Sequence, residues 1–271
     1  MAEAGSLAAW GSGVAGPLGT TACCAERFSP TAVPGAGQVS AIATSGSFTI
    51  VARPDGTVWG WGSNQSGVLG PGPRILNLLP KRISGIGNVV ALAAGFTFVV
   101  ALTSDGSVWT WGNSSTLGRQ TTGAIDAVTP ARIPGVRHVV HIAATTTNAL
   151  AITDDGSLYS WGDNYLGEIG DGTRTGRVTP VRVPGLTHVV AAATSGDSAV
   201  AAESDVSVWA WGSDARGVPV RPGIIQSTVP VRVGGLPAVT LVAAGSDYGV
   251  ALAGDHTVCT CIHSRTTSAL P

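Results

Sequence analysis

The stretch SVWTWGNSSTLG, residues 107–118, places two tryptophans two positions apart and follows the second one with glycine. The arrangement recurs along the chain, with a first step of 51 residues and later steps of 50, at Trp10, Trp61, Trp111, Trp161 and Trp211. A glycine follows each of them, and the later four are Gly62, Gly112, Gly162 and Gly212. A fixed period of this length predicts a repeat fold in which these tryptophans and glycines are structural positions.

One repeat, residues 88–137, divides into four short segments with strand character. NVVALAAG and FVVALTS are apolar runs, and Asp105-Gly106 after them predicts a tight hairpin because this pair tolerates positive φ. SVWTWG alternates in polarity, and PARIPG predicts an edge strand, where proline is tolerated. Four strands in about 50 residues predict one blade of an all-β β-propeller.

The pair of aromatic residues has a structural interpretation in such a blade. Successive side chains of a strand point to opposite faces, so Trp109 and Trp111 share a face. We expect that face to pack on the neighbouring blade, where a large aromatic side chain buries about 150–250 Å².

Two copies, VWGWGSNQSGVLGPG at 58–72 and LYSWGDNYLGEIGDG at 158–172, carry a resemblance to a known family. They are similar to the repeat of the regulator of chromosome condensation family, and the similarity covers nearly the whole chain. The resemblance implies a β-propeller, usually of seven blades. The family's namesake is an exchange factor for a small GTPase, and bacterial relatives include β-lactamase inhibitory proteins. The residues on which exchange activity depends have no counterpart that can be aligned here.

The chain length raises the question of how the ring closes. Seven blades would need about 350 residues, whereas the chain has 271. It begins inside a third strand, GSLAAWG, and ends with first and second strands, VTLVAAG and YGVALAG. We therefore expect a single domain, 1–271, of five blades closed by pairing of residues 6–10 with 247–253, which leaves 254–271 as a degenerate surplus segment. The rival is an incomplete open ring of the seven-bladed type, which would expose strand edges and favour oligomers.

Composition argues against several classes of function. The net charge of −1 gives no electrostatic footprint for nucleic acid or for a membrane surface. The most apolar stretch, residues 89–102, is too short to span a bilayer, and no signal peptide is visible, so a cytoplasmic location is slightly favoured. The four cysteines form no C-x-x-C pair. We expect no cofactor, no metal and no catalytic residues.

Function is expected in the long loops, because they differ between copies while the strands do not. The leading hypothesis is a non-catalytic propeller that binds a partner protein through these loops. Tyrosine and arginine are enriched at binding hot spots, and the candidates are Tyr165, Arg119, Arg174, Arg177, Arg216 and Arg221. The alternatives are a lyase- or cyclase-like enzyme that uses the central channel and a small-GTPase exchange factor. The predicted inner strands favour binding, since they offer mainly small residues besides His141.

Overall fold

A computed structural model describes residues 7–14, 16–20, 26–113, 116–123, 127–213, 226–245, 248–254 and 257–261. The strands of the first half of the described chain are β1 (Ala8–Gly11), β2 (Arg27–Ala32), β3 (Ala41–Thr44), β4 (Phe48–Ala52), β5 (Val58–Ser63), β6 (Leu76–Ile83), β7 (Val89–Ala94), β8 (Phe98–Thr103), β9 (Val108–Gly112) and β10 (Ala131–Arg132). Those of the second half are β11 (Val139–Ala144), β12 (Asn148–Thr153), β13 (Leu158–Gly162), β14 (Arg177–Arg182), β15 (Val189–Thr194), β16 (Ser198–Glu203), β17 (Val208–Ser213), β18 (Gln226–Arg232), β19 (Val239–Gly245), β20 (Tyr248–Ala253) and β21 (Val258–Cys261). In this part of the chain, no helix is long and apolar enough to cross a membrane.

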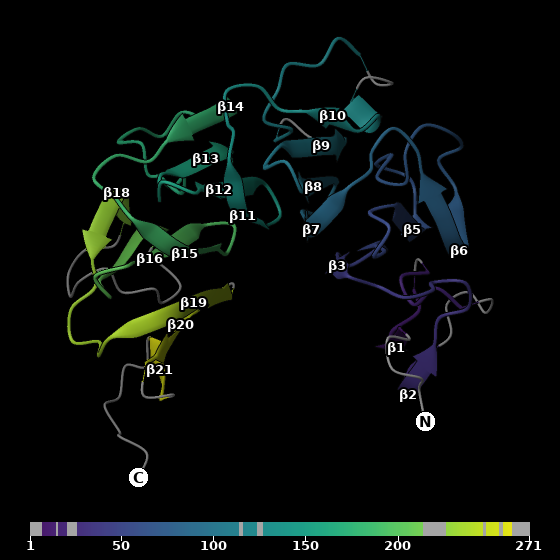
Figure 1. Cartoon of the computed structure of the whole chain (residues 1–271), viewed down its shortest axis with the longest axis horizontal. Coiled ribbons are helices and arrows are strands. Elements are labelled where there is room, and N and C mark those ends of the chain that lie inside the picture. Colours follow the sequence, from purple (N-terminus) through teal and green to yellow (C-terminus); the bar gives the residue numbers. More distant parts are fainter. Residues whose placement is uncertain are drawn as a thin grey trace.

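The strands form six antiparallel sheets in the described residues, one after another along the chain. Four of the sheets have four strands each, from β3–β6 to β15–β18, as expected for propeller blades. The sheets follow one another around an arc, and the first strand of each blade, from β3 to β19, lies on its inner side (Figure 1). The all-β propeller architecture predicted from the repeats is thereby confirmed.

The predicted joining of the two ends does not occur in the described residues. β1 pairs only with β2, and β20 pairs with β21, with Gly249 opposite Cys261 and Leu252 opposite Val258. The prediction that 254–271 is surplus is therefore wrong for 258–261, which take the third-strand position themselves. β21 (Val258–Cys261) starts only a few residues after β20 (Tyr248–Ala253) ends, and closing a short loop costs less entropy than bringing in a strand from the far end of the chain. The arc is open, with β1–β2 at one end and β19–β21 at the other (Figure 1).

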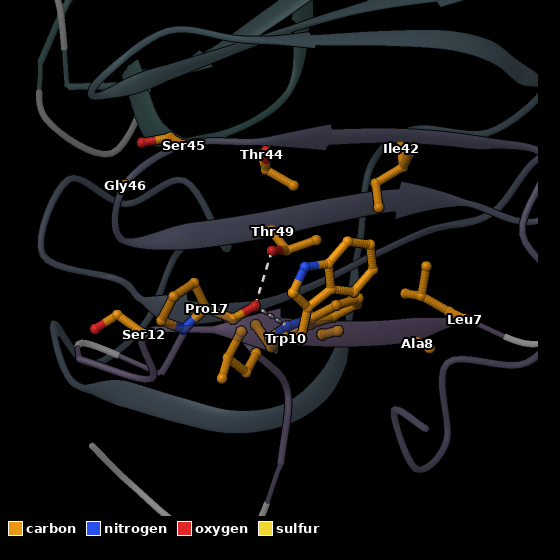
Figure 2. A pocket seen from close by; sticks show the side chains of 13 residues that line it. Leu7, Ala8, Trp10, Ser12, Pro17, Ile42, Thr44, Ser45, Gly46 and Thr49 are labelled. Carbon is orange, nitrogen blue, oxygen red and sulfur yellow. Dashed lines mark hydrogen bonds between the residues drawn. The ribbon is translucent and has the colours of Figure 1, made fainter. Parts of the chain in front are cut away.

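Trp10 marks the first end of this arc. Its side chain is 63% exposed, and it lies beside Ile42 and Thr49 at a cavity of about 370 Å³ (Figure 2). The Thr49 hydroxyl donates to the carbonyl oxygen of Pro17 at 2.9 Å, which ties the strand β4 to the segment that follows β1. Trp10 thus keeps the spacing of the repeat but lacks the burial of its counterparts.

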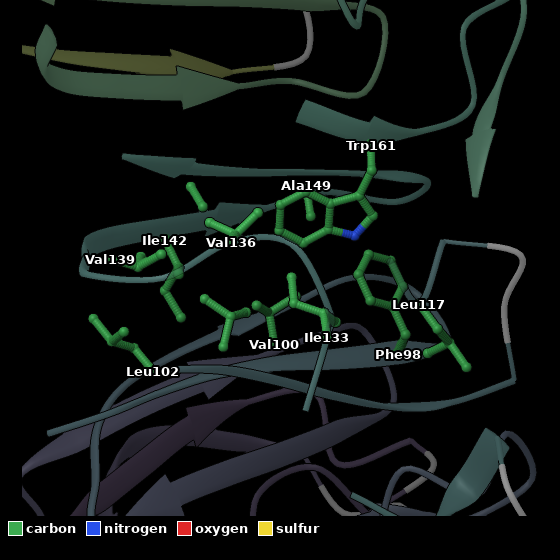
Figure 3. Close-up of a cluster of buried hydrophobic side chains, with 12 residues drawn as sticks. Phe98, Val100, Leu102, Leu117, Ile133, Val136, Val139, Ile142, Ala149 and Trp161 are labelled. Atoms are coloured by element: carbon green, nitrogen blue, oxygen red, sulfur yellow. The ribbon is translucent and has the colours of Figure 1, made fainter. Parts of the chain in front are cut away.

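The four later tryptophans of the repeat lie between neighbouring sheets. Their exposed fractions are 1% for Trp61 and 0% for Trp111, Trp161 and Trp211. Each indole Nε1 donates to a backbone carbonyl of the preceding repeat, at 2.7 Å to Pro17, 2.7 Å to Val68, 3.1 Å to Thr116 and 2.9 Å to Glu168 respectively. Around Trp161, the cluster combines Phe98, Leu117 and Ile133 of one repeat with Ala149 of the next (Figure 3). The hydrophobic core is therefore a series of interfaces between sheets rather than one central core.

The glycine after each buried tryptophan is required by its backbone. Gly112 has φ of 127°, and a Cβ on it would collide with the carbonyl oxygen of Thr97. Gly62, Gly162 and Gly212 also have positive φ and the same collision with the equivalent turn. Only glycine adopts this conformation without strain, so the chain leaves the third strand at the same place in these four blades.

Candidate functional site

One face of the arc carries both the short turns between first and second strands and the long loops between third and fourth strands. Adjacent strands are antiparallel in every sheet, so these two connections of a blade leave from the same end. We call this surface the loop face. Its described long loops are 64–75, 163–176 and parts of 12–26 and 113–130, while 214–225 lies outside the described residues.

The loop 163–176 is held rigidly by Asn164. This side chain is 1% exposed, its Oδ1 accepts from the Ile169 amide at 3.0 Å, and its Nδ2 donates to the Thr173 carbonyl oxygen at 3.0 Å. Asn64 repeats the arrangement in an earlier loop, where its Oδ1 accepts from Leu69 N at 2.9 Å. Sequence reasoning missed this role, although both asparagines stand three residues after a repeat tryptophan.

The same loop is fastened to the next blade. The Gly172 amide donates to the Thr228 carbonyl oxygen at 2.8 Å, and the Trp211 indole donates to the Glu168 carbonyl oxygen at 2.9 Å. Glu168 is 4% exposed, and its Oε2 accepts from the Leu166 amide at 2.7 Å. Burial raises the pKa of Glu168, and the nearby carboxylates of Asp197 and Asp163 add to this rise. The loop 163–176 is therefore bonded to β18 and contains the buried carboxyl group of Glu168.

Two of the predicted binding residues lie exposed on this rigid loop. The Tyr165 side chain is 77% exposed. Arg174 is exposed, and its Nη2 donates to Gln226 Oε1 of the next blade at 2.7 Å. This contact orders the guanidinium and leaves its other donors at the surface.

The other predicted arginines are placed differently. Arg177 pairs with Asp171 at 2.5 Å. Burial acts to raise the pKa of Asp171, but hydrogen bonds from Thr173 and Arg177 outweigh it and hold this pKa below its ordinary value. Arg119 is 7% exposed, and its Nη2 donates to the Thr129 carbonyl oxygen at 3.2 Å inside its own loop. Arg216 and Arg221 lie outside the described residues.

The short turns of the loop face surround a second feature, which we call the axial mouth. It is a cavity of about 390 Å³ at the inner ends of five sheets. Its lining is Ser45, Gly46, Ala94, Gly95, Phe96, Ala144, Thr145, Thr146, Thr194, Ser195 and Ala244. The described part of the chain shows no group of three His, Cys, Asp or Glu side chains that could hold a metal ion.

The repeat itself matches two family models, each described as the regulator of chromosome condensation (RCC1) repeat. One model matches residues 55–102, 105–152 and 155–202, and the other matches 39–68, 89–118 and 139–168. Together they cover more than half of the chain. The chain belongs to the RCC1 repeat family.

Two solved structures resemble this RCC1-repeat chain over nearly its whole length. Human WBSCR16 has a TM-score of 0.82 at 23% identity, over 94% of this chain and 73% of that protein. Prp20p of Saccharomyces cerevisiae, described with its binding properties to Gsp1p and histones, has a TM-score of 0.80 at 22% identity, over 95% of this chain and 68% of that one. At these identities the likeness shows the fold alone. Among curated proteins, none matches the sequence.

Two histidines, His138 and His188, stand at one equivalent position of the RCC1 repeat, directly before an inner strand. His138 and His188 have φ of 55° and 56°, as does Asn88 at the equivalent position with 55°. Their carbonyl oxygens accept from the amides of Asp154 and Ser204 at 2.9 and 3.0 Å. These residues form the left-handed turn into β7, β11 and β15, at the end of the blade opposite the loop face.

Proposed function

We propose that this chain is a non-catalytic propeller that binds a partner protein on its loop face. The observation that carries the proposal is Tyr165, an aromatic side chain 77% exposed on a loop that is otherwise fixed. Exposed tyrosine on a rigid support provides contact area with little loss of conformational entropy, which is typical of binding hot spots.

Arg174 extends the same surface. Its bond to Gln226 holds the guanidinium across the boundary between two blades. Ordered arginine with free donors favours bidentate contact with a partner's carboxylates or backbone carbonyls. Tyr165 and Arg174 together therefore support a protein partner with a mixed apolar and acidic contact patch.

The axial mouth supports binding over acid–base catalysis. Its described lining contains hydroxyl, glycine, alanine and phenylalanine side chains, none of which titrates near neutral pH. An acid–base enzyme of the central channel would place titratable groups there.

The test is affinity capture from the native host with three forms of the chain: wild type, the double variant Tyr165→Ala/Arg174→Glu, and the control Arg132→Glu. Arg132 is an exposed arginine on the outer strand β10, where it lies opposite Trp109. We expect wild type and control to retain the same partner, and the double variant to bind it about 100-fold more weakly, as two hot-spot losses of about 1–2 kcal/mol each imply. Equal capture by all three forms would refute the proposal.

A further inference from the structure

The axial mouth is formed by turns that are far apart in the sequence and equivalent in the repeat. The turns after β3, β7, β11 and β15 contribute Ser45, Phe96, Thr145 and Ser195, and Ala244 of β19 completes the rim. The Phe96 amide lies 3.4 Å from the Thr146 carbonyl oxygen, a contact between two blades. The amides of Thr145 and Ser195 donate back to their own second strands, both at 2.9 Å. The mouth is therefore a built site with a fixed rim, within the size range of about 300–1,000 Å³ usual for ligand pockets.

Its chemistry combines an apolar surface with unsatisfied hydroxyl groups. Phe96 is 61% exposed at the rim. Ser45 Oγ and Thr145 Oγ1 are buried, and neither has a hydrogen-bond partner in the described structure. The hydroxyl of Ser195, by contrast, pairs with that of Ser198 at 2.7 Å. Most buried polar groups in folded proteins have a partner, so these two hydroxyls point to a bound group that supplies one after a rotation about χ1.

We propose that the axial mouth receives an uncharged side chain from a loop of the partner, one with an apolar body and a hydrogen-bonding tip. This inference rests on the proposed function, because the mouth opens on the loop face. The apolar body packs on Phe96, and the tip satisfies Ser45 or Thr145. A charged side chain is rejected, because the described lining offers no counter-charge to offset its desolvation.

Gly46 provides a variant that closes the mouth without disturbing the fold. It lines the mouth, it is exposed, and a Cβ built on it meets no atom within 4 Å. Gly46→Leu therefore adds bulk at the mouth, and also at the cavity beside Trp10, whose lining includes Gly46. The amides of residues 95–96 and 145–146, which line the mouth only, distinguish binding at the two cavities. The matched control is Gly234→Leu, because Gly234 is also exposed with no atom within 4 Å of its Cβ, and it precedes β19 at the opposite end of the blade.

Thr145→Val gives the second, chemically finer variant. It keeps the shape of the side chain and removes a buried hydroxyl that has no partner in the free protein. We expect its melting temperature to be unchanged or raised, and its affinity for the inserted group to fall about tenfold, the usual effect of one lost hydrogen bond. A hydroxyl that only supports the fold would lower the melting temperature when removed.

The experiment is an NMR titration of the isotope-labelled full chain with N-acetyl-tyrosinamide and N-acetyl-glutaminamide, and with the charged analogues N-acetyl-lysinamide and N-acetyl-aspartamide. We expect a neutral probe to shift the amides of residues 45–46, 95–96 and 145–146 saturably, with a tenfold preference over the charged probes. Gly46→Leu should abolish these shifts, and Gly234→Leu should leave them intact. Absence of shifts with both neutral probes, equal shifts with charged probes, or shifts that persist in Gly46→Leu would each overturn the inference.

Failure here is distinguishable from failure of the proposed function. If the captured partner is lost by Tyr165→Ala/Arg174→Glu but bound equally by wild type and Gly46→Leu, the loop face binds and the mouth is not used. That result refutes the inference alone.

Discussion

The tryptophans of the repeat allow a sharp test, because the same residue occupies equivalent positions with opposite burial. Trp161 is fully buried, shares a cluster with Phe98, Leu117 and Ile133, and bonds to the Thr116 carbonyl oxygen at 3.1 Å. Trp10 is 63% exposed. Trp161→Ala removes both the packing and the hydrogen bond between two blades, whereas Trp10→Ala removes a side chain mostly in water.

The magnitude follows from these two losses. Deleting a buried tryptophan side chain costs about 3–5 kcal/mol in transfer and cavity terms. The Thr116 carbonyl oxygen loses its donor, which costs about 1 kcal/mol more if water reaches it. We therefore expect Trp161→Ala to lower the free energy of unfolding by about 4–6 kcal/mol, a large part of the about 5–15 kcal/mol of a typical domain. Trp10→Ala should change it by less than about 0.5 kcal/mol.

Urea denaturation followed by far-UV circular dichroism measures both variants against wild type. The slope of each transition must be compared as well as its midpoint, because a repeat protein need not unfold in one step. A loss below about 1 kcal/mol for Trp161→Ala, or equal losses for the two variants, would show that the interfaces between sheets do not depend on these side chains.

Two further substitutions test single side chains. Glu168→Gln imitates the protonated acid and keeps an acceptor for the Leu166 amide. Because burial raises the folded pKa of Glu168 above its ordinary 4.5, wild-type stability falls as the pH rises from about 4.5 through that folded pKa. The variant should lack this fall and be at least as stable at pH 7, by urea denaturation between pH 4 and 8; a less stable variant at pH 7 would contradict the reasoning. Val206 has φ of 67°, a strained value for a β-branched residue, at the hairpin position where three other blades have glycine. Val206→Gly should raise the free energy of unfolding by about 1 kcal/mol, and a lower melting temperature would argue against strain there.

The blades were predictable because their determinants are local. The Asp-Gly hairpins, the glycine after each tryptophan and the two-residue alternation act within about ten residues of sequence, and the structure has the strands where these patterns place them. At one such hairpin, Thr103 and Ser107 donate hydrogen bonds to Asp105, and these bonds lower the pKa of its carboxyl group. The turn is thus held by residues within two positions of the aspartate.

The joining of the ends was not predictable in this way. It depends on the angle between successive sheets, summed over the whole arc, and on competition between two strands for the edge of β20. Cys259 and Cys261 are smaller than the aromatic residues that other repeats have at the equivalent positions. β21 nevertheless pairs with β20, because the two strands are close in sequence. The sequence alone does not show how large the summed angle between the sheets is, or which of the two strands pairs with β20.

The candidate binding residues show a similar division. Tyrosine and arginine in the loops indicated a binding face, but the residue types do not reveal which side chains turn inward. Arg119 turns into its loop to satisfy the Thr129 carbonyl, while Arg174 remains exposed. The axial mouth was not predicted from the sequence, because its residues lie at turns and none of them belongs to a known binding motif. The one signal in the sequence is that Ser45, Gly95, Thr145 and Ser195 are equivalent positions of the repeat, which the fold brings together.

The bond from each indole to the preceding repeat has a consequence for how such chains change over evolutionary time. The indoles of Trp111, Trp161 and Trp211 each donate to a carbonyl oxygen in the loop of the preceding repeat. The repeats of Trp61, Trp111 and Trp161 therefore each carry a donor for the repeat before and an acceptor for the repeat after. A recombination event that deletes or duplicates one whole repeat brings a matching donor and acceptor together again, so the number of blades can drift between descendants without any compensating substitution at the new junction.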